Sequence, residues 1–78
     1  MSDAANKAFV EAVWNKASKD GWPVNAGDIR IFGGGDEVEK ASIRNVVKEC
    51  TQLGYLSATM DGDIHRLTPA GKAYIGVE

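Results

Sequence analysis

The chain is poor in the residues that small proteins use for cross-links and metal sites. Its 78 residues include one cysteine, one histidine and two prolines. One cysteine cannot form an internal disulfide, and one cysteine with one histidine cannot supply the ligands of a zinc site. We therefore expect no metal and no cofactor. A small domain without disulfides is typical of a reducing compartment, which predicts the cytoplasm.

Long hydrophobic runs are also missing. No apolar stretch approaches the ~20 residues that a membrane-spanning helix needs. The first residues, MSDAANKAFVEAVW, have no basic segment before an apolar block, so we expect neither an anchor nor a secretion signal. Hydrophobic residues make up 44% of the chain and charged residues 26%, which is typical of a folded protein. Residues 1–78 should form one small domain.

Positive charge is in deficit, because nine Lys and Arg residues face eleven Asp and Glu residues, for a net charge of −2. This balance provides no general attraction for nucleic acid or for an anionic membrane. Any nucleic-acid function must therefore rest on a local basic patch. A domain of this size also has little room for an enclosed catalytic cavity.

The residues that could carry catalysis do not form a catalytic set. Cys50 falls on the apolar stripe of a predicted helix, which favours a buried, unreactive thiol. The Asp61-Gly62-Asp63 segment begins like a calcium loop, but the twelfth position is Lys72. The glycines at 33–35 lack the Gly-Lys-Ser/Thr ending of a phosphate loop. We expect a protein that is not an enzyme.

Periodicity and caps predict the main elements. A helix should run over residues 4–19 from a cap at Ser2 or Asp3, and a second long helix should begin at Asp36, where Glu39 completes a capping box, and end before Gly54. Thr68 and Pro69 predict a short final helix through Ile75. The apolar stripe expected on the second long helix consists of Val38, Ile43, Val46, Val47, Cys50 and Leu53.

The segment 24–32 fits two structures. Asn25 could cap a short helix in which Ile29 and Phe32 share a face, whereas Ile29 and Ile31 alternate around Arg30 as in a short strand. The helix is the favoured interpretation. Three consecutive glycines at 33–35 then predict a flexible turn.

The segments 55–60 and 63–67 should form a hairpin around a two-residue Asp61-Gly62 turn. That register pairs Leu56 with Leu67, Ala58 with His65 and Met60 with Asp63 on one face of the hairpin, and we expect this face to be the core side. His65 is then expected to pack beside Ala58. The other face pairs Ser57 with Arg66 and Thr59 with Ile64.

Two segments give the chain a resemblance to winged helix-turn-helix domains. One is SIRNVVKECTQLGYL at 42–56, which is similar to the family's passage from recognition helix to wing; the other is LTPAGKAYI at 67–75, similar to its exit from the wing. The resemblance implies an α+β fold with three helices, a two-stranded hairpin wing and a short C-terminal helix. It also favours the helical interpretation of 24–32, and it implies a small DNA-binding or transcription-regulatory domain.

The cations on the exposed face of the helix at 36–53 are the candidate DNA contacts. Arg and Asn can pair with base edges, and Lys can contact phosphates. Acidic residues at the start of this helix and at the wing tip oppose that function, because carboxylates repel phosphates. The expected nucleic-acid-binding residues are Lys40, Ser42, Arg44, Asn45, Lys48 and Arg66.

An acidic winged helix that binds protein is the alternative. The first helix has a wider apolar face than a thin core requires, so a homodimer could cover the excess. The residues expected at that dimer surface are Phe9, Val10, Val13 and Trp14. If this alternative holds, Lys40, Arg44 and Lys48 should be neutralised by neighbouring carboxylates such as Glu37 and Glu49.

Overall fold

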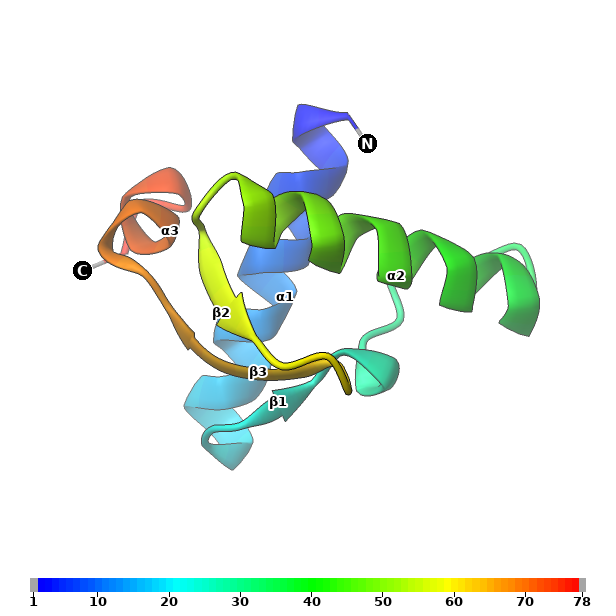
Figure 1. Cartoon of the computed structure of the whole chain (residues 1–78), viewed down its shortest axis with the longest axis horizontal. Coiled ribbons are helices and arrows are strands. Elements are labelled where there is room, and N and C mark those ends of the chain that lie inside the picture. The colour runs from blue at the N-terminus through cyan, green and yellow to red at the C-terminus, as the bar shows by residue number, and fades with distance from the viewer. Residues whose placement is uncertain (1, 78) are drawn as a thin grey trace.

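A computed structural model describes residues 2–77 of the chain, and it has a mixed α+β architecture. The three strands pair antiparallel in the order β1-β3-β2. In Figure 1, α2 crosses in front of α1, the sheet lies below α2, and α3 lies beyond the beginning of β2. Within the described residues, no helix has the length and hydropathy to cross a membrane. In chain order the elements are α1 (Asp3–Asp20), β1 (Val24–Asn25), the 3-10 turn η1 (Ala26–Asp28), α2 (Asp36–Gln52), β2 (Leu56–Ala58), β3 (Asp63–Leu67) and α3 (Pro69–Tyr74).

The helix ends follow the predicted caps in α1 and α3. The Ser2 side chain accepts a hydrogen bond from the backbone N–H of Ala5 at the start of α1, and Gly21 closes that helix. Thr68 caps α3 by accepting from the N–H of Gly71, with Pro69 in the first turn. Both helices therefore lie where the sequence places them, to within about one residue.

The face of α1 that was expected to form a homodimer surface is buried in the core. Phe9, Val10 and Val13 are each 0% exposed, and they pack in one cluster with apolar residues of α2 and the sheet. Trp14 is half-buried against this cluster. The predicted dimer surface was wrong for the three buried residues, because the α2 and sheet side chains of the same chain already cover them. Homodimerisation itself stays a prediction, and it would need other residues.

The apolar stripe predicted for α2 is confirmed in its centre and wrong at its ends. Ile43, Val46 and Cys50 are buried, and Val47 is half-buried. Val38 is 55% exposed and Leu53 52%. At the first turn of α2, the position that faces inward belongs instead to Glu39, which is only 4% exposed.

The buried Glu39 carboxylate binds the backbone that precedes α2. Its Oε1 accepts from the N–H of Ile31 at 2.7 Å, both carboxylate oxygens accept from the N–H of Phe32 at 3.0 and 3.1 Å, and Oε2 also accepts from Gly33. The expected capping box was wrong, because α2 begins after Gly35 without a side-chain cap. Hydrogen bonds to the charged form, the bond from Phe32 foremost, hold the pKa of Glu39 below its usual value despite desolvation.

The segment 24–32 is neither the expected short helix nor one strand. Val24–Asn25 pairs with β3, Ala26–Asp28 forms one 3-10 turn, and the chain then runs irregularly to α2. Asn25 does cap the turn, since its side chain accepts from the N–H of Gly27. The helix stops after one turn because the N–H groups that follow Arg30 bond to Glu39 instead of to helical carbonyls. The glycines at 33–35 all have positive φ, which side chains rarely tolerate.

The hairpin has a longer turn and a different register from those predicted. The N–H of Gly62 donates to the carbonyl of Thr59, and the N–H of Thr59 donates to that of Asp63, so three residues form the loop. Gly62 has a φ of 88°, as the last position of such a loop requires. Leu56 and Ser57 pair with Leu67 and Arg66 as expected, but a bulge then sets Ala58 opposite Ile64.

The bulge decides which side chains of β3 face the core. Ile64 is 0% exposed and Leu67 3%, although they are three positions apart. His65 lies between them and is exposed, so its predicted packing against Ala58 was wrong. Met60, expected on the core side, is fully exposed at the tip of the hairpin.

Replacing Glu39 should weaken the fold and change its response to acid. Because its pKa is lowered on folding, the Glu39 carboxylate stabilises the protein above its unfolded pKa near 4.5, and that contribution disappears as the pH falls through the folded pKa. Glu39→Gln should lower the Tm by several degrees at pH 7 and reduce the loss of stability between neutral and acidic pH. Thermal unfolding followed by circular dichroism over this pH range checks it. The control Glu37→Gln, exposed on the same turn, should leave both unchanged; an equal effect of the two variants would contradict the role of Glu39.

Gly71→Ala should destabilise the junction between α3 and β2. A Cβ at position 71 would lie 1.9 Å from the carbonyl oxygen of Tyr55, so α3 would have to move away from the sheet. We expect a loss of about 1–3 kcal/mol in the free energy of unfolding, typical of overpacking, measured by urea denaturation. Ala70→Ser, on the exposed side of α3, is the control and should change stability by less than about 0.5 kcal/mol. A Gly71→Ala variant as stable as this control would refute the close approach.

Candidate nucleic-acid interface

A groove of about 670 Å³ separates α2 from the tip of the hairpin. The exposed side of α2 forms one wall, and the residues around Met60 together with those of η1 form the other. Ile43 and Val47 of α2, with Ala26 and Ala58, supply apolar surface inside it.

Hydrogen bonds fix the hairpin to η1 and so set the position of the second wall. The N–H of Ala26 donates to the carbonyl of Gly62 at 2.9 Å. The Asn25 side-chain amide donates to the Asp63 carboxylate, also at 2.9 Å. These bonds extend the pairing of β1 with β3 to the loop, so the hairpin tip and η1 form one connected wall.

Four cations line the groove. Lys40, Arg44 and Lys48 recur every four residues along α2 and therefore lie on one side of the helix. Arg30 comes from the irregular segment after η1. One carboxylate, that of Asp61, lines the groove with them. The groove is thus positively charged on a chain whose net charge is −2.

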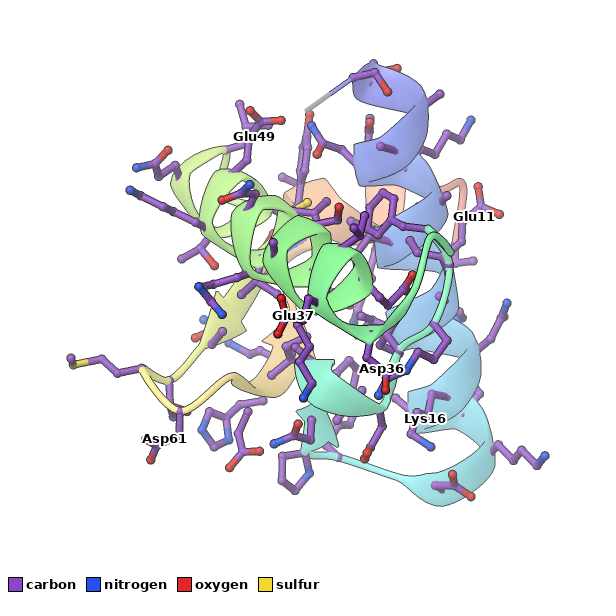
Figure 2. All side chains as sticks on the ribbon, turned by 90° about the vertical axis from the view of Figure 1, so that its right-hand side faces the viewer. Glu11, Lys16, Asp36, Glu37, Glu49 and Asp61 are labelled. Atoms are coloured by element: carbon purple, nitrogen blue, oxygen red, sulfur yellow. The ribbon has the colours of Figure 1, made fainter. Side chains whose placement is uncertain are left out.

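The three α2 cations are free of ion pairs in the part of the chain that the structure describes. Within residues 2–77, the ion pair shorter than 4.0 Å that the structure contains joins Lys16 to Asp20, both in α1. Glu49, the neighbour expected to neutralise the stripe, instead accepts a hydrogen bond of 2.6 Å from Asn6. Figure 2 shows Glu49 on the side of α2 away from the hairpin tip, where Asp61 lies. The Asn6 hydrogen bond is also the main reason that the pKa of Glu49 is lowered.

Acidic residues lie both beside the groove and within its lining. Asp36 and Glu37 occupy the first turn of α2, and Asp61 lies at the hairpin tip (Figure 2). All three are exposed. A polyanion is therefore attracted by the α2 cations and repelled by the first turn of α2 and by the hairpin tip, which reduces the surface available for phosphate contacts.

The structure brings together three of the six predicted contact residues and separates the other three. Ser42 and Asn45 do not line the groove. At about 100° per residue, Ser42 lies about 160° around α2 from Arg44, and Asn45 lies about 100° from it. Arg66 is exposed on β3 opposite Ser57 and also lies outside the groove.

Sequence reasoning missed Arg30 as a groove residue. It lies in the segment 24–32, where its alternation with Ile29 and Ile31 was interpreted only as a sign of a short strand. Asn25, Thr51 and Thr59 add hydrogen-bonding side chains to the lining, and no periodic pattern connects them because each belongs to a different element.

The other chemically capable residues lie apart from the groove. Burial raises the pKa of the Cys50 thiol to about 11, so the thiolate nucleophile is disfavoured at neutral pH. In residues 2–77, no three His, Cys, Asp or Glu side chains are grouped closely enough to hold a metal ion.

Comparison of the chain with protein-family models, with curated proteins and with solved structures found no match.

Removing the groove cations should leave the fold intact. Lys40, Arg44 and Lys48 are exposed and have no ion-pair partner among the described residues, so Lys40→Ala, Arg44→Ala and Lys48→Ala should each change the free energy of unfolding by less than about 0.5 kcal/mol. Urea denaturation at pH 7 measures this. Asn6→Ala is the matched contrast: it removes the partner of Glu49 and should be clearly destabilising. A loss of more than about 1 kcal/mol in any of the three cation variants would show that these side chains serve the fold.

Proposed function

We propose that this chain is a winged helix-turn-helix domain that binds duplex DNA through the groove between α2 and the β2–β3 hairpin. In this proposal it acts without catalysis, as a small DNA-binding or transcription-regulatory domain, with α2 as the recognition helix and the hairpin as the wing. The order of elements supports the assignment: a helix, a short strand, one turn, a long helix and a hairpin, with the first strand beside the last. The difference from the family pattern is that η1 replaces the second helix.

One observation carries the DNA proposal: Lys40, Arg44 and Lys48 converge on one groove without carboxylate partners among the described residues. A row of cations without carboxylate partners can bind a phosphate backbone. Each cation–phosphate contact releases condensed counterions, which favours binding. The Glu49 carboxylate, which was expected to neutralise the stripe, accepts a hydrogen bond from Asn6.

The acidic residues determine what kind of binding to expect. Asp36 and Glu37 repel phosphates beside the first turn of α2, and Asp61 repels them at the hairpin tip. Few contacts then carry the affinity, so the proposed complex is weak at physiological salt, and its salt dependence is modest, at about 0.9 in the log–log slope for each phosphate contact.

A protein-interaction module is the second candidate, and the exposed apolar side chains favour it. Met60 at the hairpin tip is fully exposed, while Val38 and Leu53 on α2 are more than half exposed. These residues lie at separate places and do not form a defined patch, which is why the cationic groove has priority.

Titration of the ¹⁵N-labelled protein with a mixed-sequence duplex of about 20 base pairs tests the proposal. Amide shift changes should concentrate on Lys40 to Lys48 and on the hairpin loop, and three phosphate contacts on α2 should make the affinity fall about 40-fold between about 50 and 200 mM salt. The variant Lys40→Ala/Arg44→Ala/Lys48→Ala should reduce the slope of log affinity against log salt by about 3, because each phosphate that is no longer neutralised lowers that slope by about 0.9.

A matched control separates the groove from total charge. Lys7→Ala/Lys16→Ala/Lys19→Ala removes the same three charges from α1, outside the groove lining, and should retain most of the affinity. If the wild-type protein shows no shifts at low salt, or if the two triple variants lose affinity equally, the groove is not a DNA interface, and the protein-interaction candidate replaces it.

A further inference from the structure

Arg30 is the groove cation that does not belong to α2. Its side chain forms hydrogen bonds with nearby backbone carbonyl groups. Its Nη1 donates to the carbonyl oxygen of Gly27 and, at 3.0 Å, to that of Ile29. The N–H groups on Nε and Nη2 have no hydrogen-bond partner within residues 2–77. The guanidinium is therefore anchored through one nitrogen and keeps donors for an external anion.

The chain is also fixed on both sides of Arg30. Before it, η1 is bound to the hairpin through Ala26, and Ile29 is buried in the core at 4% exposed. After it, the N–H groups of Ile31, Phe32 and Gly33 all bond to the Glu39 carboxylate. The exposed Arg30 side chain thus belongs to a backbone segment that hydrogen bonds and the burial of Ile29 hold in place against η1 and α2.

Resting on the proposed DNA-binding function, we propose that Arg30 is a fourth phosphate-contacting residue, which the segment between η1 and α2 presents to the groove already oriented. The ligand chemistry is a phosphodiester of the DNA backbone. A planar guanidinium can donate two parallel hydrogen bonds to phosphate oxygens. Prior anchoring reduces the rotamer entropy that the side chain gives up on binding.

The position of Arg30 gives it a role that the α2 cations cannot have. Lys40, Arg44 and Lys48 lie on one helix and so contact phosphates along one line. Arg30 lies off that line, on the segment that leads from η1 to α2. A contact from a second element fixes the orientation of the duplex relative to α2, which is the usual task of phosphate contacts.

Fluorescence anisotropy of a labelled duplex of about 20 base pairs, titrated at salt concentrations from about 50 to 200 mM, tests this inference. Arg30→Ala should weaken binding about tenfold at the lowest salt, equally for unrelated sequences, and should reduce the salt slope by about 0.9. Arg66→Ala is the control, because it removes an exposed arginine that the structure places outside the groove; its slope should equal that of the wild type.

Arg30→Lys separates charge from orientation. A lysine keeps the charge but carries it on one nitrogen, so it has no planar fork and cannot be anchored through one nitrogen while it presents others to the phosphate. It should restore the salt slope and only part of the affinity. Arg30 and Arg66 are both exposed, so all three variants should remain folded, which circular dichroism verifies.

The outcomes distinguish this inference from the proposed function. Wild-type protein that does not bind the duplex overturns both. Wild-type binding with an Arg30→Ala slope equal to that of the wild type, or with an equal reduction in Arg66→Ala, overturns the Arg30 contact and leaves the α2 interface standing. An Arg30→Lys affinity equal to that of the wild type overturns the anchored orientation.

Discussion

The hydrogen bonding of the Glu39 carboxylate to three successive backbone N–H groups is the constraint on which the rest of the architecture depends. Seven residues without regular structure separate η1 from α2, and buried backbone donors in such a segment need partners. Glu39 supplies them from inside the first turn of α2. These hydrogen bonds hold the start of α2 against the segment that follows η1 and so fix one end of the groove. A charged side chain is stable at this buried position because those donors replace the water that it loses.

The charge distribution reconciles an acidic chain with a cationic groove. Several carboxylates are occupied by structural hydrogen bonds: Glu39 with the backbone, Glu49 with Asn6, and Asp63 with Asn25. Asp3 likewise accepts from the Tyr74 hydroxyl, whose pKa is raised by desolvation first and by that carboxylate second. Carboxylates engaged in this way serve the fold and do not neutralise the α2 cations. The net charge of −2 is therefore a poor guide to the field inside the groove, since placement decides which cations remain free.

The sequence predicts the elements that local rules control. Caps at Ser2 and Thr68 and the regular apolar spacing place the three α-helices, and the Asp61-Gly62 turn signal places the hairpin. The departures arise where distant residues decide. Glu39 has the spacing of a capping box, but its carboxylate finds better donors in a segment that the spacing does not reveal. Because of the bulge after Ser57, Ile64 is buried in the core in place of the expected His65. An extra residue in one strand reverses the faces of the residues that follow it. Arg30 joins the groove through tertiary placement alone.

The wall formed by η1 and the hairpin tip has a thermodynamic consequence. Its position is set by bonds that exist before anything enters the groove: Ala26 to Gly62, and Asn25 to Asp63. A ligand that fits between this wall and α2 finds the surface preformed, so association requires little ordering of the backbone. The heat-capacity change on binding then reflects the apolar area that the ligand buries, here the small patch around Ile43 and Val47, and not coupled folding. The protein therefore sets the distance between the two walls of the groove before a ligand binds.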